Sequence, residues 1–423
     1  FTSDFYFRDN YDKIVMIDYV KKIDQVTRKE INDAMSIPVS NYRRAQQKGF
    51  LGYGQMLDKI ASYLKIKTNF QASEIEELDH NFSRFYTCIC FSQEEDANHY
   101  YQKIIEKRPQ YENSILMITV YLAQLVHYLT DINYTRNLNI QKQEEAIEYL
   151  RSFVDKMSNE HRFLFYEYMS TYSAIKKDVD NVVHYARLTS YLGVNYPDLE
   201  PTANYHISFS YSLVSDFINA LIYANKALPK LEEQLNYNKA VLARVNIAAL
   251  YKKLGNIDEA KRLLKKNLVH MSFNSIHKLK RATELNYADC LLMEHNYKGA
   301  LEHYNIILTE ILMKPDYESI MRTYCMYQLN KIDDANAYTV ELQMLEKEKK
   351  YPMEYLSLIL FFRSYFNKED NLDQAYKAAE ELMGAYKFRG QYIQEVAKSL
   401  YLGNASKRGN KNMPDSNLAE YVL

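Results

Sequence analysis

Glycine and proline are scarce in this chain, and tryptophan is absent altogether. Its 423 residues include Gly 10, Pro 8 and Trp 0, whereas sheets joined by many tight turns need more glycine and proline. The deficit favours long helices and predicts an all-α fold. No stretch approaches the ~18 uninterrupted apolar residues of a membrane-spanning helix. The first residues also lack the basic and then apolar pattern of a secretion signal, so we expect a cytoplasmic protein that has no membrane partner.

Motifs of metal binding and catalysis are missing as well. The four cysteines, Cys88, Cys90, Cys290 and Cys325, form no CxxC pair, and the ten histidines show no pairing at metal-ligand spacing. The sequence has no glycine-rich phosphate loop, no HExxH and no nucleophile elbow. We therefore expect buried free thiols, no metal, no cofactor and no enzymatic activity.

Charge is balanced over the whole chain but not along it. The 53 basic and 54 acidic residues leave a net charge of −1, which says nothing about partners. Residues 1–68 hold 12 Lys or Arg and 8 Asp or Glu, so a mildly basic N-terminal part precedes a mildly acidic body. A local positive balance favours contact with nucleic-acid phosphates.

A repeated pattern of small and aromatic residues runs through the body of the chain. In its clearest unit, residues 246–264, Tyr251 is followed by Gly255 in a turn and then by Ala260. The small residue recurs at intervals of 38, 40, 40, 35 and 40 residues, as Val182, Ala220, Ala260, Ala300, Ala335 and Ala375. This pattern resembles tetratricopeptide repeats, with a period longer than their usual ~34 residues. The resemblance implies a solenoid of paired helices.

The same body carries signals for helix ends and for further pairs. Prolines fall where helices of such an array are expected to end, at Pro197, Pro201, Pro229, Pro315 and Pro352. Two more degenerate helix pairs are expected around Ala97 and Ala146. The last residues, 403–423, are polar at first and show no apolar period, so we expect a loosely held tail there.

The N-terminal part follows a different pattern. Thr27 is expected to cap a helix, with Glu30 at the capping-box position, and residues 27–44 then have the pattern of helix, tight turn and helix. This stretch resembles the helix-turn-helix of phage-repressor-like regulators. The apolar residues that would lock its two helices together are Ile31, Met35, Ile37 and Tyr42.

Two positions of this motif depart from that family. Ser36 stands where the family has Gly in the turn, and Asn32 stands where it has Ala at the helix crossing. The apolar residues of 56–64 match the helix that closes these small domains. The resemblance therefore implies a small helix-turn-helix domain ahead of the repeats.

The second helix of the motif would be the DNA-reading helix. If it begins near Val39 and turns Tyr42 and Ala45 to the core, its outward side chains are Ser40, Asn41, Arg43, Arg44, Gln47 and Lys48. Asn and Gln can pair with adenine, and Arg with guanine, in the major groove. Lys48, together with Arg28 and Lys29, is better interpreted as a phosphate contact. A solvated polar helix face is the alternative interpretation of the same residues.

The first helices of the repeats offer candidates for ligand binding, because the inner surface of such an array is its usual binding face. The residue five places before each Tyr251 equivalent is expected to face inward, which selects Tyr168, His206, Asn246, Asn286 and Met321. Asn246 and Asn286 lie 40 residues apart in matching places, and a ladder of carboxamides can hold the backbone of an extended peptide. An exposed Asn without a role is the alternative for each taken alone.

A small helix-turn-helix followed by a tetratricopeptide array is similar to the RNPP family of peptide-sensing regulators. The resemblance implies a cytoplasmic transcription factor that forms a homodimer, binds double-stranded DNA and binds a short oligopeptide. It implies DNA contacts by Ser40, Asn41, Arg43 and Arg44, and peptide contacts by Asn246 and Asn286. The expected domains are residues 1–66 for DNA binding, 67–74 as a linker, 75–402 as the repeat domain and 403–423 as a polar tail.

Two functions remain open at this point. In the first, the peptide tightens or relaxes the superhelix and resets the spacing of two DNA-binding heads. In the second, the repeats are a protein-interaction scaffold that does not bind DNA, and the N-terminal block is a helical cap.

Overall fold

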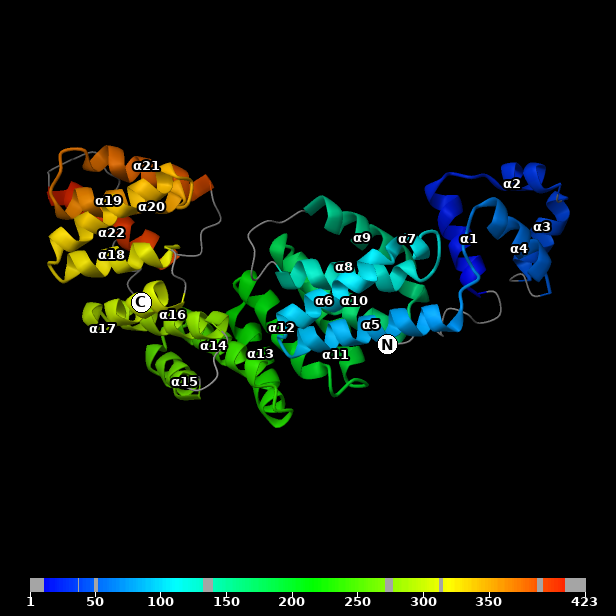
Figure 1. Cartoon of the computed structure of the whole chain (residues 1–423), viewed down its shortest axis with the longest axis horizontal. Helices are drawn as coiled ribbons and strands as arrows, with labels where there is room; N and C mark the ends of the chain where they lie inside the picture. The colour runs from blue at the N-terminus through cyan, green and yellow to red at the C-terminus, as the bar shows by residue number, and fades with distance from the viewer. Residues whose placement is uncertain are drawn as a thin grey trace. The chain divides into compact units, whose positions relative to one another are not determined.

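The structure is a computed structural model that describes residues 11–36, 38–48, 52–131, 140–270, 277–311, 315–385 and 391–407. Within these ranges every regular element is a helix, and no strand occurs. Figure 1 follows the succession of helices from blue to red. The prediction of an all-α fold is therefore confirmed for the described residues.

The described residues of the N-terminal block form the helices α1 (Tyr11–Ile23), α2 (Arg28–Met35), α3 (Val39–Gln47) and α4 (Gly54–Tyr63). The predicted capping box is present, because the Thr27 hydroxyl accepts from the Glu30 backbone N–H while the Glu30 carboxylate accepts from the Thr27 N–H. Ser36 ends α2 with φ 50° in the left-handed region. That conformation explains why the turn favours glycine.

The body begins with α5 (Ala72–Cys90) and α6 (Glu94–Glu106), followed by the short α7 (Arg108–Tyr111), by α8 (Met117–Asp131) and α9 (Ile140–Phe153), and by a 3₁₀ turn, η2 (Val154–Lys156). Three pairs follow: α10 (Asn159–Ile175) with α11 (Val179–Gly193), α12 (Glu200–Leu213) with α13 (Phe217–Glu233), and α14 (Tyr237–Lys253) with α15 (Ile257–His270). The rest of the body comprises α16 (His277–Met293) with α17 (Tyr297–Ile306) and the π-helical η3 (Ile307–Ile311), then α18 (Glu318–Gln328) with α19 (Ile332–Lys347), α20 (Met353–Phe366) with α21 (Leu372–Ala385), and α22 (Gln391–Lys407).

Each of these repeats has a residue with left-handed backbone at a fixed position, from which the other positions can be counted. It stands in the turn between the paired helices, at Lys177, Ser215, Gly255, His295 and Asn330, with φ between 56° and 79°. The small residue five places later is fully buried in every case, at Val182, Ala220, Ala260, Ala300 and Ala335. Closely packed helices need a small side chain where they cross, so the predicted repeat frame is confirmed for these five pairs. In α21 the frame shifts, because Ala375 is only partly buried.

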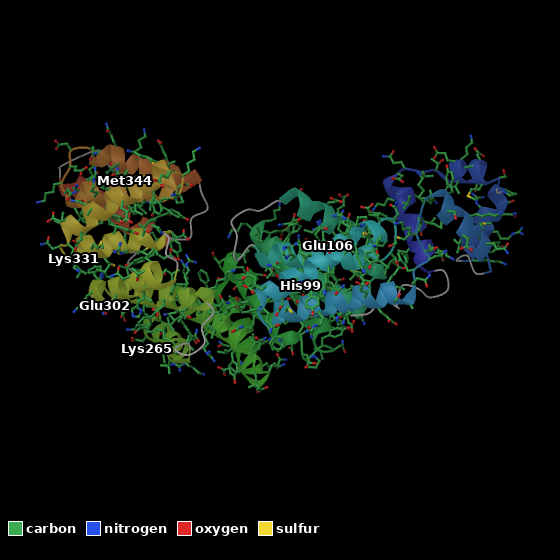
Figure 2. All side chains as sticks on the ribbon, in the orientation of Figure 1. His99, Glu106, Lys265, Glu302, Lys331 and Met344 are labelled. Carbon is green, nitrogen blue, oxygen red and sulfur yellow. The ribbon has the colours of Figure 1, made fainter. Side chains whose placement is uncertain are left out.

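The helices on either side of each turn are capped by neighbouring residues. The N–H of Asn256 bonds to the Tyr251 carbonyl at 2.8 Å, which closes the first helix as a Schellman motif. The side chain of Asn256 then accepts from the Glu259 N–H and starts the second helix. Asp or Asn fills the same capping position at Asp178, Asp216 and Asn296. Second helices turn charged side chains to solvent, as Figure 2 shows for the exposed Glu106, Lys265 and Glu302.

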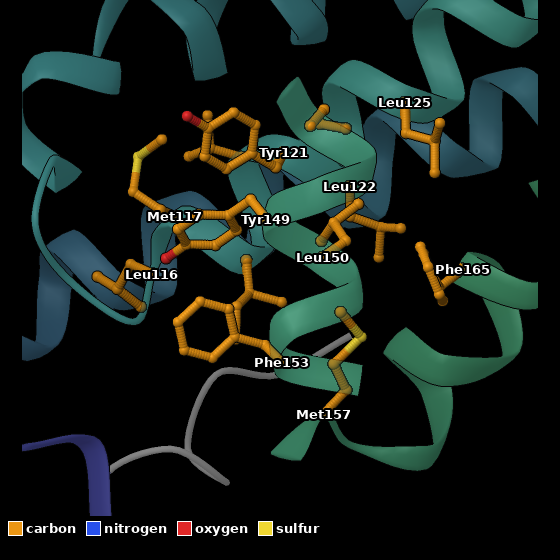
Figure 3. Packing of buried hydrophobic residues seen from close by; sticks show 14 of the residues in the cluster. Leu116, Met117, Tyr121, Leu122, Leu125, Tyr149, Leu150, Phe153, Met157 and Phe165 are labelled. Atoms are coloured by element: carbon orange, nitrogen blue, oxygen red, sulfur yellow. The ribbon is translucent and has the colours of Figure 1, made fainter. Parts of the chain in front are cut away.

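The chain divides into two compact units, the first ending at Ala240 and the second starting at Val241. The core of the first unit is rich in aromatic rings. Tyr149 lies 4.5 Å from Tyr121 and 4.7 Å from Phe153 between ring centroids, and Figure 3 shows these rings packed beside Leu150. The second unit has its own cluster, in which Phe361 and Phe362 of α20 are fully buried. Each unit thus buries its own apolar side chains.

Three expectations about chain boundaries need correction. Helix α5 starts at Ala72, so residues 72–74 of the predicted linker are helical, whereas residues 67–71 lie outside the helices, with Lys67 bonded to the Pro109, Gln110 and Asn113 carbonyls. Pro229 lies inside α13 instead of after it, and the helix continues for one more turn to Glu233. Helix α22 continues to Lys407, into the predicted tail, and residues 408–423 lie outside the described residues.

Candidate functional site

The predicted DNA-reading helix α3 turns its polar face to solvent. Ala45 is fully buried, while the outward side chains predicted from the sequence are exposed, namely Ser40, Asn41, Arg43, Arg44, Gln47 and Lys48. Lys29 on α2 is exposed too, whereas the side chains of Arg28 and Tyr42 and all of Ile37 lie outside the described part. The five predicted positions of α3, together with Lys48 directly after it, thus share one accessible surface.

The crossing of α2 with its neighbours contains a buried polar group. Ile31 is fully buried, as the motif predicts, and Asn32 beside it is 3% exposed. Neither the nitrogen nor the oxygen of the Asn32 carboxamide has a hydrogen-bond partner. An Ala at this position would bury no polar group, which gives a physical reason for the residue type seen in the family.

Helix α1 joins the N-terminal block to the first helix pairs of the body. The Tyr19 ring lies 4.9 Å from Tyr149 and 4.7 Å from Phe153 of α9, and Met16 and Ile17 are buried in the same core. Leu57 and Ile60 of α4 belong to this core as well. The block is therefore packed on the body through α1, within the first unit.

The five inward positions predicted in the repeats occupy equivalent places. Tyr168, His206, Asn246, Asn286 and Met321 each precede the left-handed residue of their repeat by nine places. We expected an accessible side chain at Tyr168, but this residue is only 3% exposed. Its ring lies 5.6 Å from that of His206, and the neighbouring helices cover it. Met321 is also 3% exposed. These two residues contribute to the core and offer little surface to a ligand.

His206 belongs to a buried polar group in the first unit. Its Nδ1 lies 2.5 Å from Oε1 of Glu167, whose Oε2 accepts from the Tyr86 hydroxyl at 2.9 Å. Glu167 is fully buried. Burial lowers the pKa of His206, although the hydrogen bond to Glu167 opposes the shift. The hydrogen bond to Glu167 fixes the orientation of the His206 ring. The second ring nitrogen, Nε2, takes no part in this bond.

Asn286 of the second unit has an oriented carboxamide. Its oxygen accepts from Lys252 Nζ at 3.2 Å, and its nitrogen donates to the Ala282 carbonyl at 2.9 Å. Lys252 is itself paired with Asp289 at 2.9 Å. A carboxamide has two N–H groups and two acceptor lone pairs, so Asn286 keeps one N–H and one lone pair for another partner. Asn246 is partly buried at the matching place of α14.

Glu167 and Lys252 were not selected from the sequence. Both lie next to positions of the repeat frame, Glu167 directly before Tyr168 and Lys252 directly after Tyr251. A charged residue beside an aromatic position of the repeat could have drawn attention to both from the sequence. Such a pattern does not predict which partner neutralises the charge. Those partners come from other helices, 34 to 81 residues away in sequence.

Metal and membrane sites are not found in the described ranges. No three His, Cys, Asp or Glu side chains are grouped there closely enough to hold a metal ion. None of the described helices is long and apolar enough to cross a membrane. The four cysteines are buried free thiols, as predicted, and burial raises the pKa of Cys90 and Cys325 to about 12.

Comparison with known proteins gives a match in structure. No protein-family model and no curated protein matches the sequence. The apo form of RapI superimposes with a TM-score of 0.58 at 15% identity, over 80% of this chain and 99% of that chain. NprR in complex with its cognate peptide NprX gives a TM-score of 0.51 at 14% identity, over 81% and 100%. Aspartyl phosphate phosphatase F from Bacillus subtilis gives 0.55 at 16%, over 82% and 92%.

This chain has the fold of Rap and NprR. At these identities the likeness is one of fold. The resemblance to RNPP-type regulators predicts this fold. The match in structure also confirms the expected tetratricopeptide-like solenoid.

Proposed function

We propose that the chain is a transcriptional regulator that binds double-stranded DNA through α3 and senses a short peptide through its repeats. The observation that carries the DNA part is the exposure of the polar α3 face while Ala45 is buried. Asn41 and Gln47 are suited to adenine and Arg43 and Arg44 to guanine. Lys29 and Lys48 supply phosphate contacts, which add affinity without reading sequence.

Charge removal on α3 tests the DNA part. Arg43→Ala combined with Arg44→Ala is expected to weaken retention of genomic DNA fragments by ~1–3 kcal/mol for each lost guanine contact and to relax the sequence preference of binding. The matched control is Lys265→Ala with Lys266→Ala, which removes two adjacent exposed positive charges from α15. Electrophoretic mobility shifts at two salt concentrations measure both. Equal retention by the two double variants would contradict DNA binding through α3.

The peptide part rests on the repeat fold and on the amide groups of α14 and α16. Asn286 is oriented by Lys252 and Ala282 and retains hydrogen-bonding capacity, and Asn246 stands one repeat earlier. His206 contributes through Nε2 in the first unit, and Tyr168 acts only by supporting the His206 ring. NprR, which has the same fold, was solved with its cognate peptide NprX, which supports a peptide as the ligand class.

Mass spectrometry of material that co-purifies with the chain tests this part. A short bound oligopeptide is expected with the unaltered protein, and the peptide affinity is expected to fall about 2- to 12-fold in Asn246→Ala and in Asn286→Ala, since each lost hydrogen bond costs ~0.5–1.5 kcal/mol. Asn195→Ala, at an exposed position outside the repeat frame, serves as the control. Absence of any peptide, or equal yield in all variants, would count against the assignment.

The regulator is further proposed to act in the cytoplasm as a homodimer. Two helix-turn-helix heads must reach half-sites about one helical turn, ~34 Å, apart, so a peptide that alters the superhelix would change DNA affinity. A full switch requires a difference of about 5.5 kcal/mol in peptide affinity between the two shapes. Light scattering with and without peptide measures the oligomeric state, and a monomer under both conditions would exclude this mechanism.

A second candidate is a protein-interaction scaffold that binds no DNA. The packing of Tyr19 against Tyr149 and Phe153 favours it, because the N-terminal block then serves as a cap for the body. The α3 charge variants separate the two candidates. A scaffold predicts unchanged behaviour in every DNA assay, with the fold intact.

A further inference from the structure

The end of α5 is held by side chains from the start of α14. Asn236 Nδ2 donates to the Cys90 carbonyl at 2.9 Å, Asn238 Nδ2 to the Phe91 carbonyl at 3.3 Å and Lys239 Nζ to the Ile89 carbonyl at 3.1 Å. The last carbonyls of a helix lack intrahelical donors, and a cation is favourable there. These bonds bring the Lys239 side chain into the interior of the first unit, where the residue is 4% exposed.

The buried ammonium of Lys239 is incompletely satisfied. An ammonium has three N–H donors, and the Ile89 carbonyl accepts from one of them. The Tyr205 ring lies 5.4 Å from Nζ, but none of the described carboxylates lies within ion-pair distance. Glu167 is close enough to influence Lys239, yet its two oxygens are engaged by Tyr86 and His206. Burial lowers the pKa of Lys239, as expected for a desolvated cation that lacks a counter-charge.

A small cavity adjoins this ammonium. It measures about 40 Å³ and is lined by Lys239, by Ile89 and Ser92 at the end of α5, by Gln93 and Ala97 of α6, and by His127 and Thr130 of α8, among others. The Ser92 hydroxyl is buried and has no hydrogen-bond partner. Buried hydroxyls without partners are rare in folded proteins, so this one points to a missing acceptor or donor.

The N-terminus of α6 adds a third donor set. Gln93 at the N-cap makes no side-chain capping bond, and the first N–H groups of a helix have no intrahelical acceptor. The helix dipole also makes this end favourable for negative charge. Glu94 is the acidic side chain among the lining residues, and it is exposed, so water screens its repulsion.

We propose that this cavity binds one small monovalent anion, either chloride or a small carboxylate such as formate. Lys239 supplies the charge, the Ser92 hydroxyl donates one hydrogen bond, and the first turn of α6 supplies the dipole. The cavity has room for one small anion, because about 10–15 Å³ of such space is enough for a water molecule and the cavity measures about 40 Å³. The bound anion would tie the start of α6 to the start of α14 and stabilise the first unit.

Thermal unfolding at constant ionic strength tests the proposal with the full chain. Sodium chloride, bromide and formate are exchanged for sodium gluconate, whose anion is too large for the cavity. The unfolding temperature is expected to rise with the logarithm of chloride or formate concentration and to stay flat in gluconate. A rise with chloride and bromide but not with formate identifies a halide site, and a rise with formate alone identifies a carboxylate site. Equal effects of all four anions would overturn the proposal, as would no effect of any.

Two variants at the cavity and one matched control test where the anion binds. Ser92→Gly removes the hydroxyl and keeps the left-handed backbone of φ 56°, so we expect a folded protein whose anion affinity falls several-fold. Ser215→Gly is its match, because Ser215 has φ 65° in the equivalent turn of another repeat but is exposed; its anion response should equal that of the unaltered protein. Lys239→Met should abolish the response. An undiminished response in Ser92→Gly places the anion elsewhere and refutes the site.

Discussion

At the scale of single residues, two buried polar side chains of the first unit affect its stability in different ways. Asn32 is buried with an unpartnered carboxamide, so its desolvation is not compensated. His161 is fully buried between Ser158 Oγ, 2.6 Å from Nδ1, and Thr119 Oγ1, 3.3 Å from Nε2. The buried Asn32 carboxamide lowers the stability of the fold at all pH values. Burial of His161 lowers it only at pH values where the imidazole takes up a proton in the unfolded state.

We predict that Asn32→Ala stabilises the N-terminal block. Removing an unsatisfied buried polar group is worth ~1–3 kcal/mol, and Ala also has the higher helix propensity. The measurement is hydrogen exchange of the α2 and α4 amides, which should slow. Asp33→Ala, at an exposed position of the same helix, controls for propensity and should change stability by no more than ~0.5 kcal/mol. Faster exchange in Asn32→Ala would show that the carboxamide has a partner.

His161 predicts a dependence of stability on pH. Burial lowers its pKa from 6.5 to about 3, so the unfolded state binds more protons between these pH values. The free energy of unfolding therefore falls as the pH falls from 6.5 toward 3. Urea unfolding at pH 7 and pH 5 should show that the pH 5 loss is smaller in His161→Asn by roughly 2 kcal/mol. Identical losses in both proteins would assign the acid sensitivity to other groups.

At the scale of the element, the turn between paired helices is the unit that repeats. A left-handed residue and a fully buried small residue stand at fixed spacing in five pairs, and in four of them a capping Asp or Asn follows the left-handed residue directly. Only Gly255 adopts the left-handed conformation without cost, because it lacks a Cβ. The remaining pairs use Lys, Ser, His or Asn there, which shows that the Schellman bonds and the packing of the next helix enforce the conformation.

Gly255→Ala isolates this backbone effect. A Cβ at Gly255 would have no atom within 4 Å, yet φ is +79°, so the substitution should destabilise the second unit by ~1–2 kcal/mol through the backbone alone. Gly403→Ala is the matched control, since its Cβ also has open space but the residue lies in α22 without positive φ. It should stabilise by ~0.5–1 kcal/mol. Calorimetry of both variants measures the difference, and shifts of the same sign would contradict the argument.

At the scale of the whole molecule, contacts between residues about 150 places apart hold the first unit together. The Asn236, Asn238 and Lys239 side chains bond to the last carbonyls of α5, and the first unit ends at Ala240, inside α14. The first turn of α14 thus belongs to the unit that its side chains bind. In an array of stacked pairs each repeat contacts only its neighbours, so these bonds, like the contact of Tyr19 with Tyr149, add long-range contacts to the first unit.

Asn236→Ser tests the closure. Ser preserves the N-cap of α14, where Asn236 Oδ1 accepts from the Lys239 N–H at 3.3 Å, but loses the donor to the Cys90 carbonyl. We expect a loss of ~1–3 kcal/mol for this buried bond and faster exchange at both α5 and α14. Asn238→Ala, which removes an exposed bond of 3.3 Å, should cost less than half as much. Faster exchange at α14 alone would show that only the cap was disturbed.

The sequence by itself determined the helices, the repeat frame and the polar face of α3. These features depend on residues within about ten places of each other, such as Thr27 with Glu30 or Gly255 with Ala260, so local patterns carry them. Tertiary structure decided which inward residues are accessible and which charges are paired. Tyr168 is buried, Glu167 bonds Tyr86 and His206, and Lys239 reaches Ile89. Spacing cannot predict these outcomes, because the partners meet only when helices from distant repeats pack and exclude water.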